Sequence, residues 1–188
     1  PPFYGIVGLV VPDIDGIKQR FKLLHNLGKF EGTPYDWVEE DNTVLITSPF
    51  GYRLRLHSRG NIEFSKPLGI AYIEVPVPLG QAVRVGSFYE QIIGAPVKFN
   101  EEVGTKSAIV TAGPHQEIKF IERELENYDT HTMHISYHVT HYNELRQKLK
   151  ERDSLMGIGE GEAFFFNKIF DPDTGEILMT VQNEVRSV

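Results

Sequence analysis

GIVGLVVPD (residues 5–13) opens a strand pattern that returns as GIAYIEVPVP (69–78) and HISYHVTHY (134–142). Each apolar strand is followed by an amphipathic stretch and later by a turn with a proline: SPFGYRLRL (48–56), GPHQEIKFI (113–121) and DPDTGEILM (171–179). The strand openings recur after 65 and 64 residues, measured between Val10, Val75 and Val139 (75 − 10 and 139 − 75). A period of this length, with one complete supersecondary unit in each repeat, indicates duplication of a single building block.

The spacing of apolar residues inside each repeat predicts the order β-α-β-β-β. In the first repeat, Asp13 is placed to cap a helix, and Gly28 follows the end of that helix. In the third repeat, Asn143 is expected to cap a helix that carries Leu145 and Leu149 inward. The other expected elements are a helix at 81–93 closed by Gly94 and strands near 29–31, 37–47, 52–57, 97–101, 107–111, 117–122, 162–167 and 176–183.

Composition excludes several classes of protein. With 188 residues, 40% hydrophobic and 24% charged, the chain is typical of a soluble globular protein. The net charge of −7 and the lack of a Lys/Arg cluster argue against nucleic-acid binding. Because there is no cysteine, any metal must have nitrogen and oxygen ligands. No apolar run approaches the roughly 18 residues of a membrane span, and we expect a cytoplasmic protein without membrane contact.

The strongest resemblance to a known superfamily lies in the third repeat. Its first strand, HISYHV (134–139), is led by a histidine, and its last strand follows the turn FDPDTGEILM (170–179). These features resemble the vicinal-oxygen-chelate superfamily of glyoxalase, bleomycin-resistance and extradiol-dioxygenase proteins. The resemblance extends over nearly the whole chain as three modules. It implies an α+β fold of tandem β-α-β-β-β modules, whose U-shaped mixed sheets enclose a cleft.

In many members of this superfamily, a divalent metal in the cleft is held by the head of the first strand and by the last strand of each module. The resemblance therefore makes His134 a metal ligand, with Fe, Mn, Zn or Ni as the possible cofactor. The matching positions elsewhere are Gly5 and Ile70 on the first strands, and Arg55, Phe120 (or Lys119 after a one-residue slip) and Leu178 on the last strands. A cationic side chain repels a divalent metal, so these residues predict a degenerate or absent metal site.

Strand alternation names the other candidate site residues. Side chains two residues apart share a face, so His134, Ser136 and His138 are expected to face the cleft. By the same reasoning, Tyr72 and Glu74 face the cleft from the second repeat. In the first repeat, the residues expected to face the cleft are Gly5, Val7 and Leu9. We assign Glu74 and His138 to acid-base catalysis and Tyr72, Ser136 and Arg55 to ligand binding. Arg53, Arg55 and His57 share one face and could together hold an anionic ligand.

Three functions remain open from the sequence. One is a module that binds a small molecule in the cleft without a metal. The second is an active metal-dependent lyase or dioxygenase that uses His134. The third is a structural or regulatory module of a larger assembly, because three modules leave one without an internal partner.

The expected domains follow the repeats. Residues 1–58 would form a single module, with a second chain or an absent module as its partner. Residues 59–68 would be a linker, and residues 69–188 a paired-module domain. The unpaired first module would then allow a homo-oligomer. The run Phe164 to Phe166 is expected to be a strand buried on both faces, and His131 is expected to lie on a loop outside the cleft.

Overall fold

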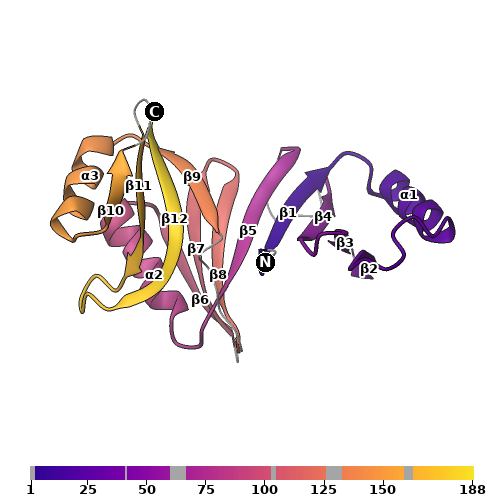
Figure 1. Ribbon diagram of the computed structural model, residues 1–188, viewed down its shortest axis with the longest axis horizontal. Helices are drawn as coiled ribbons and strands as arrows, with labels where there is room; N and C mark the ends of the chain where they lie inside the picture. Colours follow the sequence, from indigo (N-terminus) through magenta and orange to yellow (C-terminus); the bar gives the residue numbers. More distant parts are fainter. Residues whose placement is uncertain (1–2, 41, 60–66, 103–104, 126–132, 159–162) are drawn as a thin grey trace. The chain divides into compact units, whose positions relative to one another are not determined.

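The computed structural model describes residues 3–40, 42–59, 67–102, 105–125, 133–158 and 163–188 (Figure 1). It has the expected α+β composition of helices and mixed sheets. The chain forms two compact units: Pro1–Pro76 with Gly113–Lys119, the first unit, and Val77–Ala112 with Phe120–Val188, the second unit. His131 lies outside the described residues. Within the described residues, no helix is long and apolar enough to cross a membrane.

The first unit is built on one mixed sheet with a helix against it. Its elements are β1 (Ile6–Val11), α1 (Ile14–Asn26), β2 (Asp36–Glu40), β3 (Thr43–Thr47), β4 (Arg53–Ser58) and the part of β5 (Gly69–Val77) up to Pro76. The strand order is β2-β3-β4-β1-β5. The strand β1 runs parallel to β4 and antiparallel to β5.

Local sequence accounts for the position of α1. The Asp13 side chain accepts a hydrogen bond of 2.8 Å from the backbone N–H of Gly16, which confirms the predicted cap. One face of the helix packs on the buried residues Val44, Ile46 and Leu56. The strand expected at 29–31 is wrong: Gly28 and Gly32 adopt positive φ angles, and the chain there forms turns.

Pairing of β1 with β5 joins the first repeat to the start of the second. Ile6 lies opposite Glu74, and Gly8 lies opposite Tyr72. The compact unit that contains residues 1–58 therefore extends to Pro76 and includes Gly113–Lys119. The compact units consequently have boundaries different from the predicted 1–58 and 69–188.

The second unit contains the helical part of the second repeat and all of the third. Its elements are α2 (Ala82–Phe88), η1 (Tyr89–Ile93), β6 (Val97–Glu102), β7 (Thr105–Gly113), β8 (Gln116–Glu122), β9 (His134–Val139), α3 (Tyr142–Glu151), β10 (Leu155–Ile158), β11 (Ala163–Phe170) and β12 (Ile177–Ser187). Residue 113 of β7 and residues 116–119 of β8 belong to the first unit. The strands of the third repeat form a separate sheet in the order β10-β11-β12-β9, with β9 parallel to β12. The strand β10 was not predicted from the sequence.

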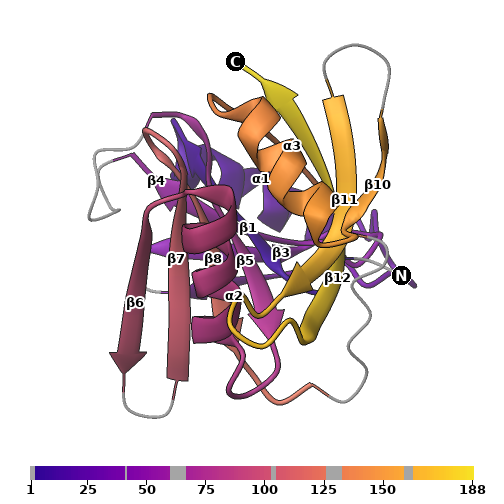
Figure 2. The same ribbon diagram turned by 90° about the vertical axis from the view of Figure 1, so that its left-hand side faces the viewer.

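An aromatic core holds the second unit together. Figure 2 shows α2 between the β6 and β7 strands and the sheet of the third repeat. Phe88 of α2 is completely buried, with its ring centroid 6.0 Å from that of Phe166 and 5.0 Å from that of Phe170. The helix continues through η1 and ends at Gly94, which has φ of 76° as predicted.

Two local predictions for the third repeat are corrected. Phe164 and Phe166 are buried whereas Phe165 is partly exposed, so β11 alternates instead of being buried on both faces. The residue before α3 is His141, not Asn143, and its ring nitrogen lies 2.7 Å from the carbonyl oxygen of Ile93. This side-chain contact holds the start of α3 against the end of η1.

The DPDTG turn is fixed by a single arginine. The Asp171 carboxylate accepts hydrogen bonds from the backbone N–H groups of Asp173 and Thr174, at 2.9 and 3.1 Å. Arg84 of α2 donates to Asp171 at 2.6 Å and to Glu176 at 2.5 Å. The turn before β12 is thereby attached to the helix of the preceding repeat.

Replacing Arg84 with methionine is expected to weaken the pH dependence of stability. The hydrogen bond from Arg84, aided by the Thr174 backbone N–H, holds the pKa of Asp171 below its usual value of 3.8. A lowered folded-state pKa gives stability that is present above the unfolded-state pKa and is lost as the pH falls through the folded-state value. Melting temperature measured from about pH 6 to about pH 3 should therefore fall less steeply for Arg84→Met than for the wild type. Arg20→Met, at an exposed arginine of α1, is the control and should keep the wild-type slope. An unchanged slope for Arg84→Met would contradict the assignment.

Candidate functional site

The site on the first unit is the sheet face that points away from α1. Leu54 and Leu56 of β4 contact the α1 core, so Arg53, Arg55 and His57 lie on the opposite face. In β1, Leu9 packs on the α1 side. The residues of β1 on the face away from α1 are therefore Ile6, Gly8 and Val10. The set Gly5, Val7 and Leu9 predicted for that face is wrong by one residue.

Arg55 lies at the centre of this face and contacts two carboxylates. Its Nε lies 3.1 Å from Oε2 of Glu40 on β2, and one terminal nitrogen lies 3.2 Å from Oε1 of Glu74 on β5. The side chain of Arg55 is 23% exposed and that of Glu74 is 13% exposed. Burial lowers the pKa of Arg55, but the hydrogen bond with Tyr72 and the charges of Glu74 and Glu40 raise it above the usual value. Arg55 is therefore a permanent cation between two carboxylates.

Tyr72 lies beside this ion-pair cluster and also contacts His57 and Lys119. Its hydroxyl is 2.8 Å from Nε2 of His57, and the ammonium of Lys119 lies 4.1 Å from its ring centroid. The ring crosses β1 at Gly8, where an added Cβ would come within 2.3 Å of the ring. Burial raises the pKa of Tyr72, the hydrogen bond with Arg55 lowers it, and the charge of Glu74 raises it, with a net increase. The phenol therefore stays protonated near neutral pH.

The structure brings together four of the residues predicted from the sequence: Arg55, His57, Tyr72 and Glu74. We call this group, together with Glu40, the Arg55 cluster. Glu40 was not predicted from the sequence, because its place on this face depends on the register of three strands. In the β2-β3-β4 ladder, Glu40 pairs with Thr43, and Thr43 pairs with His57, so all three share a face.

The remaining predicted residues lie on the second unit. His134, Ser136 and His138 are exposed along β9, and Val139 at its end is buried. Nε2 of His134 lies 3.2 Å from Oε2 of Glu184 on β12, and Glu184 also contacts Arg186. Glu184 was not predicted from the sequence, because the resemblance places the matching ligand position of the last strand at Leu178, which is buried. Among the described residues, no contact of Ser136 or His138 defines their predicted roles.

The two places differ in their fit to a divalent metal. Among the described residues, no group of three or more His, Cys, Asp or Glu side chains is arranged to hold a metal ion. At the Arg55 cluster, a guanidinium occupies the space between the carboxylates, and this arrangement does not fit a cation. On the second unit, His134 and Glu184 offer one nitrogen and one carboxylate ligand, which fit a metal as a partial site.

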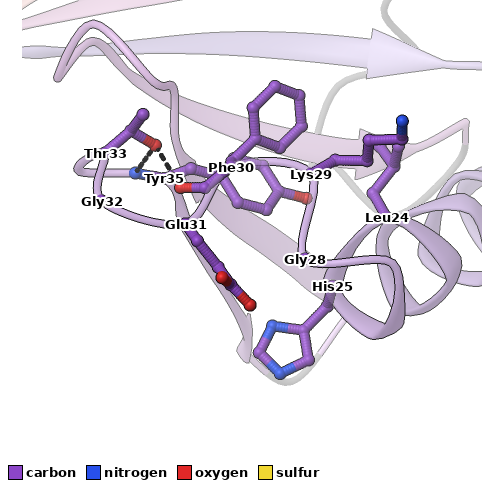
Figure 3. Close-up of a pocket in the computed structure, with 9 residues that line it drawn as sticks. All are labelled: Leu24, His25, Gly28, Lys29, Phe30, Glu31, Gly32, Thr33 and Tyr35. Carbon is purple, nitrogen blue, oxygen red and sulfur yellow. Dashed lines mark hydrogen bonds between the residues drawn. The ribbon is translucent and has the colours of Figure 1, made fainter.

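A separate hollow of about 270 Å³ lies in the first unit, between the end of α1 and the loop that follows it (Figure 3). It is lined by Leu24 and His25 of the helix and by residues 28–33 and Tyr35. Burial, followed by the charge of Asp36, raises the pKa of Tyr35. None of the site residues predicted from the sequence lines this hollow.

Comparison with known proteins agrees with this geometry at the level of fold. No protein-family model and no curated protein sequence matches the chain. Among solved structures, a glyoxalase I variant from Zea mays is similar over 97% of this chain and 68% of its own, with a TM-score of 0.68 and 13% identity. A second variant of the maize enzyme gives a TM-score of 0.59 at 15% identity, over 97% of this chain and 66% of its own.

A protein from Bacillus subtilis described as a dioxygenase is similar over 97% of this chain and 61% of its own, with a TM-score of 0.57 and 13% identity. The chain thus has the α+β fold of glyoxalase and dioxygenase proteins. This is the fold of the vicinal-oxygen-chelate superfamily, as the sequence resemblance predicted. Identities of this size establish a shared fold and leave the substrate and the activity open.

Proposed function

We propose that the chain binds a small organic molecule at the Arg55 cluster without a metal ion there. The observation that carries this proposal is the position of Arg55 between Glu40 and Glu74. In the superfamily that the sequence resembles, this position on the last strand belongs to a metal-binding acid. In this chain, the guanidinium of Arg55 supplies the positive charge between the two carboxylates.

The positive charge of Arg55, at the position where the superfamily has a metal ligand, argues against a divalent ion at this site. A divalent ion next to Arg55 would be repelled by the guanidinium, and the carboxylates that could attract it are already paired. Releasing Arg55 from both carboxylates would leave a partly buried charge without a partner. The arrangement therefore favours polar organic groups that can exchange hydrogen bonds with Arg55 or Tyr72.

The surroundings of the cluster suit a small organic ligand. Val38 is 51% exposed on β2, and Leu45 on β3 lies opposite both Val38 and Arg55 in the ladder. Apolar surface next to a few fixed polar groups is the usual composition of a small-molecule site. The ligand would contact the apolar strands and hydrogen-bond to the tyrosine and arginine.

Titration with 4-nitrocatechol, a coloured aromatic with two adjacent oxygens, tests this proposal in the presence of a metal chelator. The wild type should bind it, and Tyr72→Phe should weaken binding about fivefold, because one hydrogen bond contributes roughly 1 kcal/mol. Tyr4→Phe, at a tyrosine that is 49% exposed, is the matched control and should bind like the wild type. Binding that requires added metal, or that is equal in Tyr72→Phe and the wild type, would reject the proposal.

The second candidate is a divalent-metal-dependent lyase or dioxygenase that uses His134. The specific observation in its favour is the 3.2 Å contact between His134 and Glu184, since both are ligand types for Fe, Mn, Zn and Ni. Glu74 and His138 were assigned to acid-base catalysis from the sequence. In the first unit, Glu74 is already engaged by Arg55, and any role in proton transfer would require it to leave that ion pair.

Metal content measured by elemental analysis distinguishes the second candidate from the first. If His134 is a ligand, protein loaded with Mn²⁺, Fe²⁺, Zn²⁺ or Ni²⁺ should retain metal after desalting, and His134→Ala should lose nearly all of it. His25→Ala, at an exposed histidine of α1, is the control and should retain the wild-type amount. Metal that remains bound to His134→Ala would remove the basis for this candidate.

A further inference from the structure

The hollow at the end of α1 is a second place where the first unit can take a small molecule. Its volume of about 270 Å³ is close to the lower end of the usual range for ligand pockets. Leu24 of the helix, together with Phe30 and Tyr35 of the segment that follows, supplies its apolar wall. The hollow shares no residue with the Arg55 cluster, so a ligand bound here is independent of the function proposed above.

The loop that borders the hollow is fixed by its own hydrogen bonds. The backbone N–H of Lys29 donates to the carbonyl oxygen of Leu24 at 3.2 Å, which ties the loop to the helix. Thr33 donates to the carbonyl oxygen of Phe30 twice, through its hydroxyl at 2.7 Å and through its backbone N–H at 3.1 Å. Because the loop is already ordered, a ligand does not lose binding free energy by ordering it.

A carboxylate lies at one side of the hollow. Figure 3 shows the carboxylate of Glu31 pointing toward the ring of His25. A Cβ atom added at Gly28 would lie 2.6 Å from Oε1 of Glu31, so this oxygen lies directly against the residue that ends the helix. Among the described residues, Glu31 forms no ion pair. Lys29 also lines the hollow, but its ammonium points away from Glu31 in the same view, which leaves the carboxylate accessible to a cationic ligand.

The helix backbone favours the same sign of ligand charge. The hollow lies at the C-terminal end of α1, a helix of 13 residues, where the aligned peptide dipoles leave a partial negative charge. The net charge of −7 also attracts cations to the protein as a whole. In the wall, the hydroxyl of Tyr35 is buried and has no hydrogen-bond partner among the described residues. Its oxygen and an unprotonated ring nitrogen of His25 are further acceptors for a donor-rich ligand.

We propose that this hollow binds a primary organic amine that carries a short apolar or aromatic body. The ammonium has three donors and no acceptor, and it donates to the carboxylate of Glu31 in a charge-assisted hydrogen bond. The body of the ligand lies against Leu24 and Phe30. An anion of the same shape is disfavoured, because it meets both the carboxylate and the negative end of α1. A neutral molecule of the same shape loses the charge-assisted hydrogen bond.

Equilibrium dialysis of the full chain against three probes of similar shape tests the class of ligand. The probes are phenethylamine, which is a cation at pH 7, the neutral 2-phenylethanol and the anionic 3-phenylpropanoate. Phenethylamine should bind saturably, and 2-phenylethanol about tenfold more weakly, because hydrogen bonds to charged groups are stronger than neutral ones. The anion should bind least. Equal or tighter binding of 3-phenylpropanoate, or no saturable binding of phenethylamine at millimolar concentration, would overturn the proposal.

Two glutamate variants and the single tryptophan locate the bound amine. Trp37 lies close to the hollow, since the ring of Phe21 is 5.7 Å from that of Trp37 and 6.4 Å from that of Tyr35, so its fluorescence should change on binding. Glu31→Gln should weaken phenethylamine binding about tenfold or more, with an unchanged circular dichroism spectrum.

Glu144→Gln is the matched control, because it makes the same change of charge at an exposed glutamate of α3 on the second unit. It should bind phenethylamine like the wild type. Equal binding to Glu31→Gln and the wild type, or an equal loss in both variants, would show that the amine is attracted by net charge and not held at the hollow.

Discussion

Phe88→Ala should lower the free energy of unfolding of the second unit by about 3–5 kcal/mol, the usual cost of truncating a fully buried phenylalanine. Phe88 has no exposed surface, and its ring lies between those of Phe166 and Phe170. Removing it leaves a cavity between α2 and β11. The loss should appear as a reduced midpoint in urea denaturation with a similar slope.

Phe50→Ala is the control for that experiment. Phe50 is 80% exposed in the turn before β4, so its removal should change the free energy of unfolding by no more than about 0.5 kcal/mol. If both substitutions had the same small effect, Phe88 would not be the residue that joins the second repeat to the third. The aromatic core described for the second unit would then be incorrect.

Repetition explains why the order of elements could be predicted from the sequence. Residues such as Asp13 and Gly94 begin and end helices through local backbone chemistry, and both act as expected. The failures occur where local pattern and tertiary contact disagree. Around residues 29–31, left-handed glycines convert an expected strand into turns, and at α3 a contact from His141 to Ile93 replaces a cap by Asn143.

The candidate site could be predicted in part, for the same reason. Arg55, Tyr72 and Glu74 were found because alternation within one strand is visible in the sequence. Glu40 depends on the register between three strands, and no local pattern reports that register. Glu184 depends on the length of β12, which places it opposite Ser136 of β9. The position that the resemblance gives, Leu178, therefore could not identify it.

Arg55→Glu is expected to convert the Arg55 cluster from a metal-free site into a metal-dependent one. Without added metal, Glu40, Glu74 and the new carboxylate would repel one another, and the first unit should lose about 2–4 kcal/mol of stability. The substitution also removes the cation that repels divalent ions and adds a third oxygen ligand. Mn²⁺ or Zn²⁺ should then restore stability, by about 2.7 kcal/mol at 100 times the dissociation constant.

Arg55→Gln separates the loss of the cation from the gain of a carboxylate ligand, because glutamine removes the cation without adding a carboxylate. It should be destabilised like Arg55→Glu, but metal should restore much less of its stability. The measurement is the thermal unfolding midpoint with and without each metal, compared with that of the wild type. A wild type whose first unit is stabilised by metal as strongly as Arg55→Glu would show that the guanidinium does not exclude a cation. The metal-free proposal rests on that exclusion, since Arg55 supplies the positive charge that a metal would otherwise provide between Glu40 and Glu74.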